Sequence, residues 1–102
     1  MTKLIALYRH PADVAAFDDY YFSKHVPLAK TIAGLRRYEI SRGGVGALQG
    51  EAPYHLAAIL SFDSMAEMQA ALASPEGRAT AADLGNFAEA GVELLIFDTE
   101  EI

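Results

Sequence analysis

The sequence predicts an α+β domain in which a four-stranded antiparallel sheet carries its helices on one face. The first observation is the order of the patterns: strand-like runs and amphipathic helical segments alternate as β-α-β-β-α-β. The second is the composition, because 102 residues with 52% hydrophobic and 22% charged side chains suit one globular core. We therefore expect a single domain that spans residues 1–102.

Four segments have the residue pattern of β-strands. Segments 4–8 and 92–97 are apolar on both faces, and segment 35–41 alternates polar and apolar residues. Segment 54–62 is apolar on both faces over its greatest length. We expect 54–62 to be a central strand and 35–41 to be half exposed.

The first helical segment follows Asp13, which is suited to cap a helix N-terminus. This helix is expected to run to about His25. Pro27 has no N–H group and disfavours a helical conformation at Val26. We therefore expect the helix to break there and a second, short helix to start near Pro27 and continue to Ala33.

The second helical region also contains a break. Ser64 and Glu67 have the spacing of a capping box, which predicts a helix over 65–73. Ser74-Pro75 then supplies a new cap and a proline in the first helical position. We expect a further helix from there to Phe87.

This order of elements is that of the ferredoxin-like split unit. Its helices cover one sheet face, yet segments 4–8, 54–62 and 92–97 are apolar on both faces. The chain has no further element to cover the second face. The sequence therefore predicts a homodimer in which two sheets pack against each other.

Charge and cysteine content exclude several classes of partner. The net charge of −6 argues against a nucleic-acid partner and against an anionic membrane surface, because both bind cationic proteins. The chain has no cysteine, which fits a cytoplasmic protein better than a secreted one. The apolar run near the N-terminus is too short for a signal peptide or a membrane span.

One helical stripe combines core residues with a titratable group. Phe17, Tyr21, His25, Leu28 and Ile32 follow one another at steps of three or four residues, so they should share the core-facing side of the helix. His25 is the member whose ordinary pKa lies near neutrality. It could act as a general acid or base, or it could be a structural histidine that holds the break before the proline.

The chain resembles the EthD-like proteins of the dimeric α/β-barrel superfamily over nearly its whole length. A Tyr-x3-His-x-Pro-Leu pattern within residues 17–29 carries the resemblance, together with segments 34–38, 53–56 and 71–77. The resemblance implies a ferredoxin-like monomer, a sheet-to-sheet dimer and a pocket between the helices and the sheet. Related barrels include cofactor-free cyclases, isomerases and monooxygenases, and others bind haem, so the fold alone does not define a reaction.

We predict that His25, Tyr21 and His55 form the catalytic group. Tyr21 lies one helical turn before His25 and could hold its imidazole or a substrate oxygen, or it could simply be a core residue. His55 lies on the opposite face of its strand from Leu56, and parity alone leaves open whether that face meets the helices. Predicted substrate contacts come from three further residues: Tyr8, Phe22 and Leu28.

The predicted function is the binding of a small apolar or aromatic carbonyl compound. If the protein is an enzyme, the expected reaction is proton transfer without a cofactor, such as isomerisation, cyclisation or decarboxylation. The alternatives are a non-catalytic accessory protein of a degradation pathway and a cofactor-free monooxygenase. We expect no metal site, because no two of the three histidines have ligand spacing.

Overall fold

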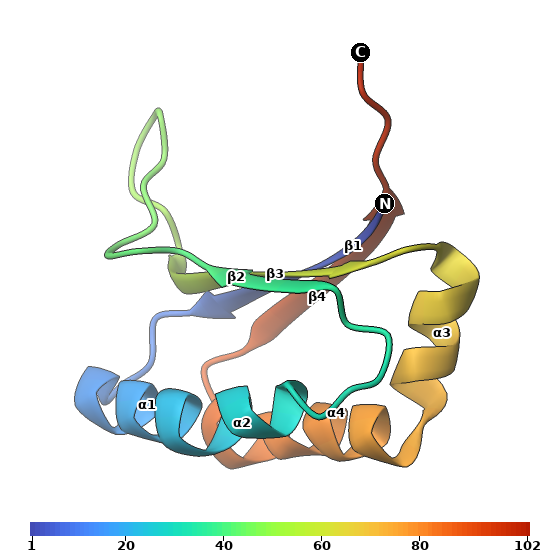
Figure 1. Cartoon of the computed structure of the whole chain (residues 1–102). Coiled ribbons are helices and arrows are strands. Elements are labelled where there is room, and N and C mark those ends of the chain that lie inside the picture. The colour runs from blue at the N-terminus through green and yellow to red at the C-terminus, as the bar shows by residue number, and fades with distance from the viewer.

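The computed structural model describes all 102 residues and contains one antiparallel sheet. Its strands are β1 (Thr2–Arg9), β2 (Arg37–Ile40), β3 (Tyr54–Phe62) and β4 (Val92–Asp98), in the order β2-β3-β1-β4 (Figure 1). This arrangement confirms the ferredoxin-like fold. β3 has the predicted bounds, β2 is shorter than the predicted 35–41, and the other two strands are slightly longer than predicted.

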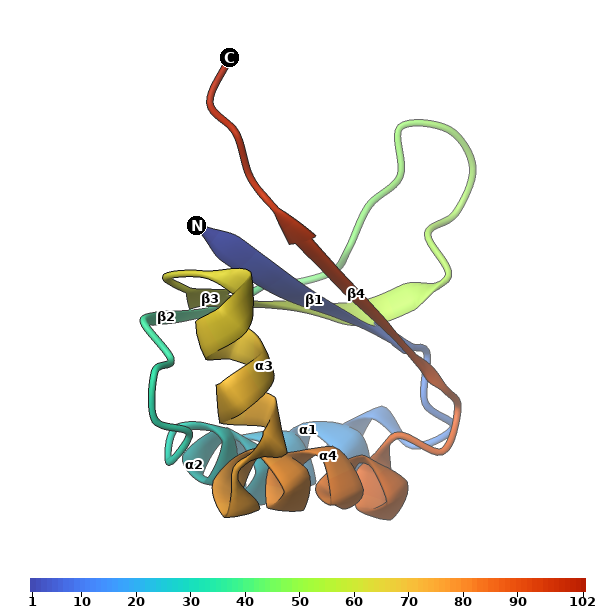
Figure 2. The ribbon, with the colours of Figure 1, turned by 90° about the vertical axis from the view of Figure 1, so that its right-hand side faces the viewer.

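All helices lie on the same side of the sheet. The first helical region comprises α1 (Val14–Tyr20), a π-helical turn η1 (Tyr21–His25) and α2 (Val26–Ala29). The second comprises α3 (Met65–Ala73) and α4 (Pro75–Phe87), as predicted. Figures 1 and 2 show α1, α2 and α4 running below the sheet, with α3 connecting the sheet to that layer at one end. None of these helices has the length and hydrophobicity that a membrane span requires.

Three predicted caps begin the helices. Oδ1 of Asp13 accepts the amide of Ala16 at 3.0 Å, and Oγ of Ser64 accepts the amide of Glu67 at 3.1 Å. Ser74 ends α3 and caps α4, where its Oγ accepts the amide of Gly77 at 3.1 Å. Local sequence therefore determines where each of these helices starts.

The predicted break at Pro27 is a wide turn rather than an interruption. Val26 stays helical, with φ −59° and ψ −50°, and its amide donates to the carbonyl of Tyr21 five residues earlier. In a regular helix the Pro27 ring would clash with the carbonyl of Ser23, and a π-type turn just before the proline relieves that clash. The prediction that helix resumes as far as Ala33 is wrong, because α2 ends at Ala29.

The core lies between the sheet and the helices and contains an aromatic cluster. The ring of Tyr8 on β1 lies 5.5 Å from Phe17, 5.5 Å from Tyr21 and 5.6 Å from Phe87. These four side chains are buried. The predicted stripe holds except at one position: Ala29 is buried in place of Leu28, which is half-buried. The cluster fixes the first helical region and α4 against the sheet.

A β-bulge changes the expected faces of β3. Tyr8 pairs with Leu56, but Arg9 pairs with Tyr54, so His55 is the extra residue. Strict alternation would place Tyr54 with Leu56 on the helix side, and this is wrong. Tyr54 shares the outer face with Arg9, whose guanidinium lies 5.6 Å from the Tyr54 ring centroid. His55 contacts α1 instead, so the bulge answers the question that parity left open.

The outer face of the sheet carries no helix (Figure 1). The pairing of the strands places six apolar side chains of the three longer strands on it: Ile5, Leu7, Ala57, Ile59, Leu95 and Phe97. Leu95 and Phe97 are 48% and 45% exposed. The expectation that the sheet is apolar on both faces is therefore confirmed.

Candidate functional site

A cavity of about 170 Å³ lies between the sheet and the helices. Its wall is mostly aliphatic and comes from all four strands and from the helical regions below them. Three ring-bearing polar side chains also line it: Tyr8 from β1, His25 from the π-helical turn and Tyr38 from β2. An apolar cavity with a few convergent polar groups is the usual form of a small-molecule site.

His25 is held by a carboxylate from the other helical region. Its Nδ1 lies 2.9 Å from Oδ2 of Asp83 on α4. Both side chains are buried, with 5% and 10% of their surface exposed. Nε2 of His25 makes no hydrogen bond within the chain, and no fully buried side-chain nitrogen lacks a partner. Nε2 is therefore not fully enclosed by protein, and His25 lines the cavity.

The surroundings of Asp83 keep its carboxylate ionised. Burial by itself would raise the pKa of Asp83, but hydrogen bonds from Tyr20, Asn86 and His25 outweigh burial and lower the pKa below its ordinary value. The Tyr20 hydroxyl donates to Oδ1 at 2.6 Å, and Nδ2 of Asn86 donates to the same oxygen at 3.0 Å. When the His25 ring is neutral, an ionised Asp83 accepts the Nδ1 proton and leaves the Nε2 lone pair free to act as a base.

The π-helical turn makes this arrangement possible. Tyr20 and His25 are five residues apart, and in a regular α-helix they would point in directions about 140° apart. The wider turn between them brings both side chains to the two oxygens of Asp83. The turn also accommodates Pro27, so the proline predicted to break the helix follows directly on the turn that aligns the histidine with its carboxylate.

Tyrosine hydroxyls form the second polar feature of the cavity. The Tyr8 hydroxyl has no partner within the chain, and burial raises its pKa well above the ordinary value of 10.0. It therefore stays protonated at neutral pH and can donate to a ligand oxygen. Tyr38 lies 2.6 Å, oxygen to oxygen, from the Tyr21 hydroxyl. When Tyr21 donates to Tyr38, the Tyr38 proton is free to point into the cavity.

The predicted residues fall into two groups. Tyr8 and His25 both line the cavity, and Tyr21 stands one hydrogen bond behind it through Tyr38. Phe22 and Leu28 do not line it; the Phe22 side chain is 50% exposed and packs edge-on against Tyr21.

His55 lies apart from this group. Its Nε2 is 2.8 Å from Oδ1 of Asp18 on α1, and its ring contacts Phe17 edge-on at 5.2 Å. Tyr8 also packs against Phe17, so the Phe17 ring contacts both Tyr8 and His55. His55 does not line the cavity, so the structure joins Tyr8 to His25 without His55.

Asp83 and Tyr38 are not among the site residues that the sequence predicts. One sequence signal was present: Asp83 lies three and four residues from Thr80 and Phe87, on the core-facing stripe of α4. A carboxylate on such a stripe is unusual unless it is paired. Tyr38 alternates with charged neighbours on a short strand, and no local pattern distinguishes it.

The described side chains do not fit a haem or a metal ion. The cavity of about 170 Å³ is smaller than the roughly 300–1,000 Å³ of pockets for drug-sized ligands, and haem exceeds such ligands. No group of three or more histidine and acidic side chains is arranged to hold a metal. Asp83, the carboxylate nearest to His25, already uses both oxygens in hydrogen bonds.

Comparison with known proteins shows the family. The model of the EthD domain matches residues 9–91. The chain belongs to the EthD family. An uncharacterised 11.0 kDa protein from the thcB-thcC intergenic region of Rhodococcus erythropolis is 46% identical to this EthD protein, over all of the chain and 98% of that relative. The solved structure of an EthD family protein from Bacillus halodurans has a TM-score of 0.90 and 38% identity, covering 98% and 99% of the two chains.

More distant structures share the fold of this EthD protein. The hydroxynitrile lyase of Passiflora edulis matches with a TM-score of 0.79 at 16% identity, over 99% of this chain and 94% of that one. A dimeric ferredoxin-like protein of unknown function from Thermobifida fusca matches with a TM-score of 0.70 at 20% identity, over 96% and 90%. The fold thus occurs both in a lyase and in a protein described as dimeric.

Proposed function

We propose that this EthD protein binds a small carbonyl compound in the cavity and moves a proton on it without a cofactor. The observation that carries the proposal is a pair of side-chain groups without protein partners, Nε2 of His25 and the hydroxyl of Tyr8, on two residues that line the same apolar cavity. A base and a hydrogen-bond donor that meet in an apolar space suit the removal of a proton next to a carbonyl.

The roles follow from the hydrogen bonds. Asp83 holds Nδ1 of His25, so Nε2 takes the proton from the substrate carbon. The resulting imidazolium is stabilised by the ionised carboxylate. Tyr8, kept protonated by burial, donates to the carbonyl oxygen as negative charge develops there, and Tyr38 is a second donor. The proton then returns from Nε2 to the enolate, either at its original carbon, which gives exchange, or at another atom, which gives an isomer.

The cavity limits the size of the substrate. An apolar cavity of roughly 150 Å³ can hold benzene, and the cavity described here measures about 170 Å³. A compound of about one aromatic ring, or an aliphatic chain of similar volume, therefore fits. The Passiflora edulis hydroxynitrile lyase has the same fold, so the fold is compatible with catalysis.

Hydrogen-deuterium exchange on a simple ketone tests the proposal. Acetophenone in D₂O has exchangeable protons beside its carbonyl, and proton NMR follows their loss directly. We expect exchange above the buffer rate with the native protein. His25→Ala should lower this rate by about 10²–10⁴-fold, because a general base contributes by that factor. Tyr8→Phe should lower it as well and leave the fold intact.

His10→Ala is the matched control, because His10 is exposed and does not line the cavity. It should leave the exchange rate unchanged. Saturable binding of acetophenone with exchange at the buffer rate would reject catalysis and favour the accessory role. Oxygen consumption during incubation with a phenolic compound would instead favour the monooxygenase alternative.

The proposal retains a separate test for His55. The sequence predicts it as a second acid or base, and its pairing with Asp18 lies outside the cavity. His55→Ala should therefore lower the exchange rate far less than His25→Ala if His25 acts alone. Equal losses in the two variants would restore His55 to the catalytic group.

We also propose that the protein is a cytoplasmic homodimer. The apolar outer face and the dimeric relative from Thermobifida fusca support the dimer. The cysteine-free sequence supports the location. Native mass spectrometry measures the oligomeric state and also detects any small molecule that is retained after purification.

A further inference from the structure

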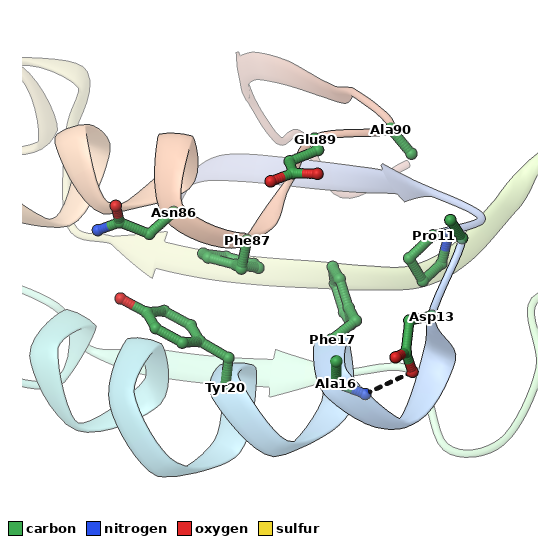
Figure 3. A pocket seen from close by; sticks show the side chains of 10 residues that line it. Pro11, Asp13, Ala16, Phe17, Tyr20, Asn86, Phe87, Glu89 and Ala90 are labelled. Atoms are coloured by element: carbon green, nitrogen blue, oxygen red, sulfur yellow. Dashed lines mark hydrogen bonds between the residues drawn. The ribbon is translucent and has the colours of Figure 1, made fainter.

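A second, larger hollow lies at the end of the helix layer. This α1–α4 groove has a volume of about 510 Å³, within the range of small-molecule sites. It is lined by the start of the first helical region and by the end of α4 with the residues that follow (Figure 3). It shares no lining residue with the cavity that contains His25. Tyr20 and Asn86 support Asp83 from the wall of this groove, but the proposed proton transfer gives its open space no role.

The wall of the groove is aromatic. Phe17, Tyr20 and Phe87 line it side by side (Figure 3). The ring centroid of Phe87 lies 5.4 Å from that of Phe17 and 5.5 Å from that of Tyr20, with the Tyr20 and Phe87 rings nearly parallel. The negative faces of such rings attract cations and apolar groups alike.

The polar side chains of the groove offer more hydrogen-bond acceptors than donors. The Tyr20 hydroxyl and one amide N–H of Asn86 donate to Asp83, so the second N–H of Asn86 is the one side-chain donor left. Three acceptors remain free: the amide oxygen of Asn86, the carboxylate of Glu89 and Oδ2 of Asp13. Glu89 has no ion-pair partner, and the other oxygen of Asp13 caps α1. No lysine, arginine or histidine lines the groove. The two carboxylates, Asp13 and Glu89, therefore favour a ligand that carries donors and positive charge.

We propose that the α1–α4 groove binds a small organic cation with an apolar body, an aryl- or alkylammonium compound. The ammonium group lies between Glu89 and Asp13, and the apolar body covers the aromatic wall. The overall charge of −6 raises the local concentration of such cations. A neutral analogue loses the charge contact, and an anionic analogue meets two carboxylates of its own sign.

Three probes of similar shape test this charge preference: 2-phenylethylammonium, 2-phenylethanol and 3-phenylpropionate. Amide shifts in ¹H–¹⁵N NMR titrations locate each probe and give its affinity. We expect saturable shifts for the ammonium compound at residues around the groove, such as Ala12 and Ala90, and weaker binding of the alcohol and the acid. Affinity should fall as salt rises.

Two pairs of variants complete the test. Glu89→Gln should weaken binding of the ammonium probe about two- to fivefold, the range of an exposed ion pair. Glu101→Gln, with the same charge change in the exposed tail, should not. Ala16→Phe fills the groove and should abolish binding, whereas Ala15→Phe alters an exposed neighbour outside the lining.

Three results would each overturn the proposal. The first is equal affinity for the alcohol and the ammonium compound, and the second is unchanged binding by Ala16→Phe. The third is a set of shifts confined to the cavity of His25. The readout is binding in a separate groove, so failure of the ketone-exchange experiment leaves this proposal unaffected. In the same way, failure of the binding experiment leaves the proposed proton transfer unaffected.

Discussion

Nδ1 of His25 and Oδ2 of Asp83 lie 2.9 Å apart although 58 positions separate the two residues in the chain. The contact orients the imidazole and determines which ring nitrogen carries the proton. Asp83→Asn should disturb both, because an amide can present either a donor or an acceptor to Nδ1. We expect long-range ¹⁵N NMR to show a single Nδ1–H tautomer in the native protein and a mixture in the variant. A single unchanged tautomer in the variant would contradict this role of Asp83.

The lowered pKa of Asp83 predicts a specific acid sensitivity. Hydrogen bonds in the folded state hold this pKa below its ordinary value of 3.8, so the unfolded chain takes up the proton first as the pH falls. The resulting stability is present above about pH 4 and is lost below it. Urea unfolding between pH 5 and pH 2.5 should show a shallower loss of unfolding free energy for Asp83→Asn than for the native protein. Asp19→Asn, an exposed aspartate, is the control.

The buried tyrosines predict a loss of stability in alkali. Burial raises the pKa values of Tyr8, Tyr21 and Tyr38 above 10.0. A raised folded-state pKa stabilises the protein fully below pH 10 and progressively less above it, because the unfolded chain ionises first. Tyr21→Phe should lower the free energy of unfolding by about 1 kcal/mol at pH 7, because the hydrogen bond to Tyr38 is lost. Above pH 10 the variant should lose stability less steeply than the native protein. Urea unfolding followed by circular dichroism between pH 7 and pH 11.5 measures both effects. Equal pH dependence of the unfolding free energy in the variant and the native protein would contradict the prediction.

Two glycines of α4 provide a matched pair. A Cβ atom on Gly77 would collide with the carbonyl oxygen of Ala71 and lie 2.7 Å from Cα of Leu72, whereas Gly85 has nothing within 4 Å. Gly77→Ala should therefore lower the free energy of unfolding by roughly 2 kcal/mol or more, since overpacking typically costs 1–3 kcal/mol. Gly85→Ala should raise it by roughly 0.5–1 kcal/mol through helix propensity. Thermal and urea unfolding of the two variants should move in opposite directions.

The outer face of the sheet predicts a charge-sensitive dimer. Leu95 is half exposed on this face and pairs along the ladder with Ile5. Leu95→Lys places a charge in the proposed sheet-to-sheet interface and should shift the protein toward monomer. Ala70→Lys makes the same change on the exposed side of α3 and should not. Light scattering after gel filtration distinguishes the two, and a native protein that is already monomeric at micromolar concentration would remove the dimer from the proposal.

Local patterns predict much of this fold because they act over a few residues. Caps at Asp13, Ser64 and Ser74 and the bounds of β3 depend on neighbouring residues alone, and the structure confirms them. The position of the irregularity before Pro27 is predicted correctly, but the structure has a widened helical turn there instead of a break. Whether a proline ends a helix or widens one turn depends on the packing of the residues on both sides, which the local sequence does not contain.

By itself, the sequence determined the order of the elements, the two apolar faces of the sheet and the position of His25 in the core. It also predicted Tyr8 and His25 as site residues, and the structure places both in the lining of one cavity. Only the tertiary structure paired His25 with Asp83, and only a one-residue bulge in β3 turned His55 toward α1. The reason is physical: a hydrogen bond between residues 58 positions apart depends on how two helices pack against one sheet, and a one-residue bulge reverses the alternation on which a strand prediction rests.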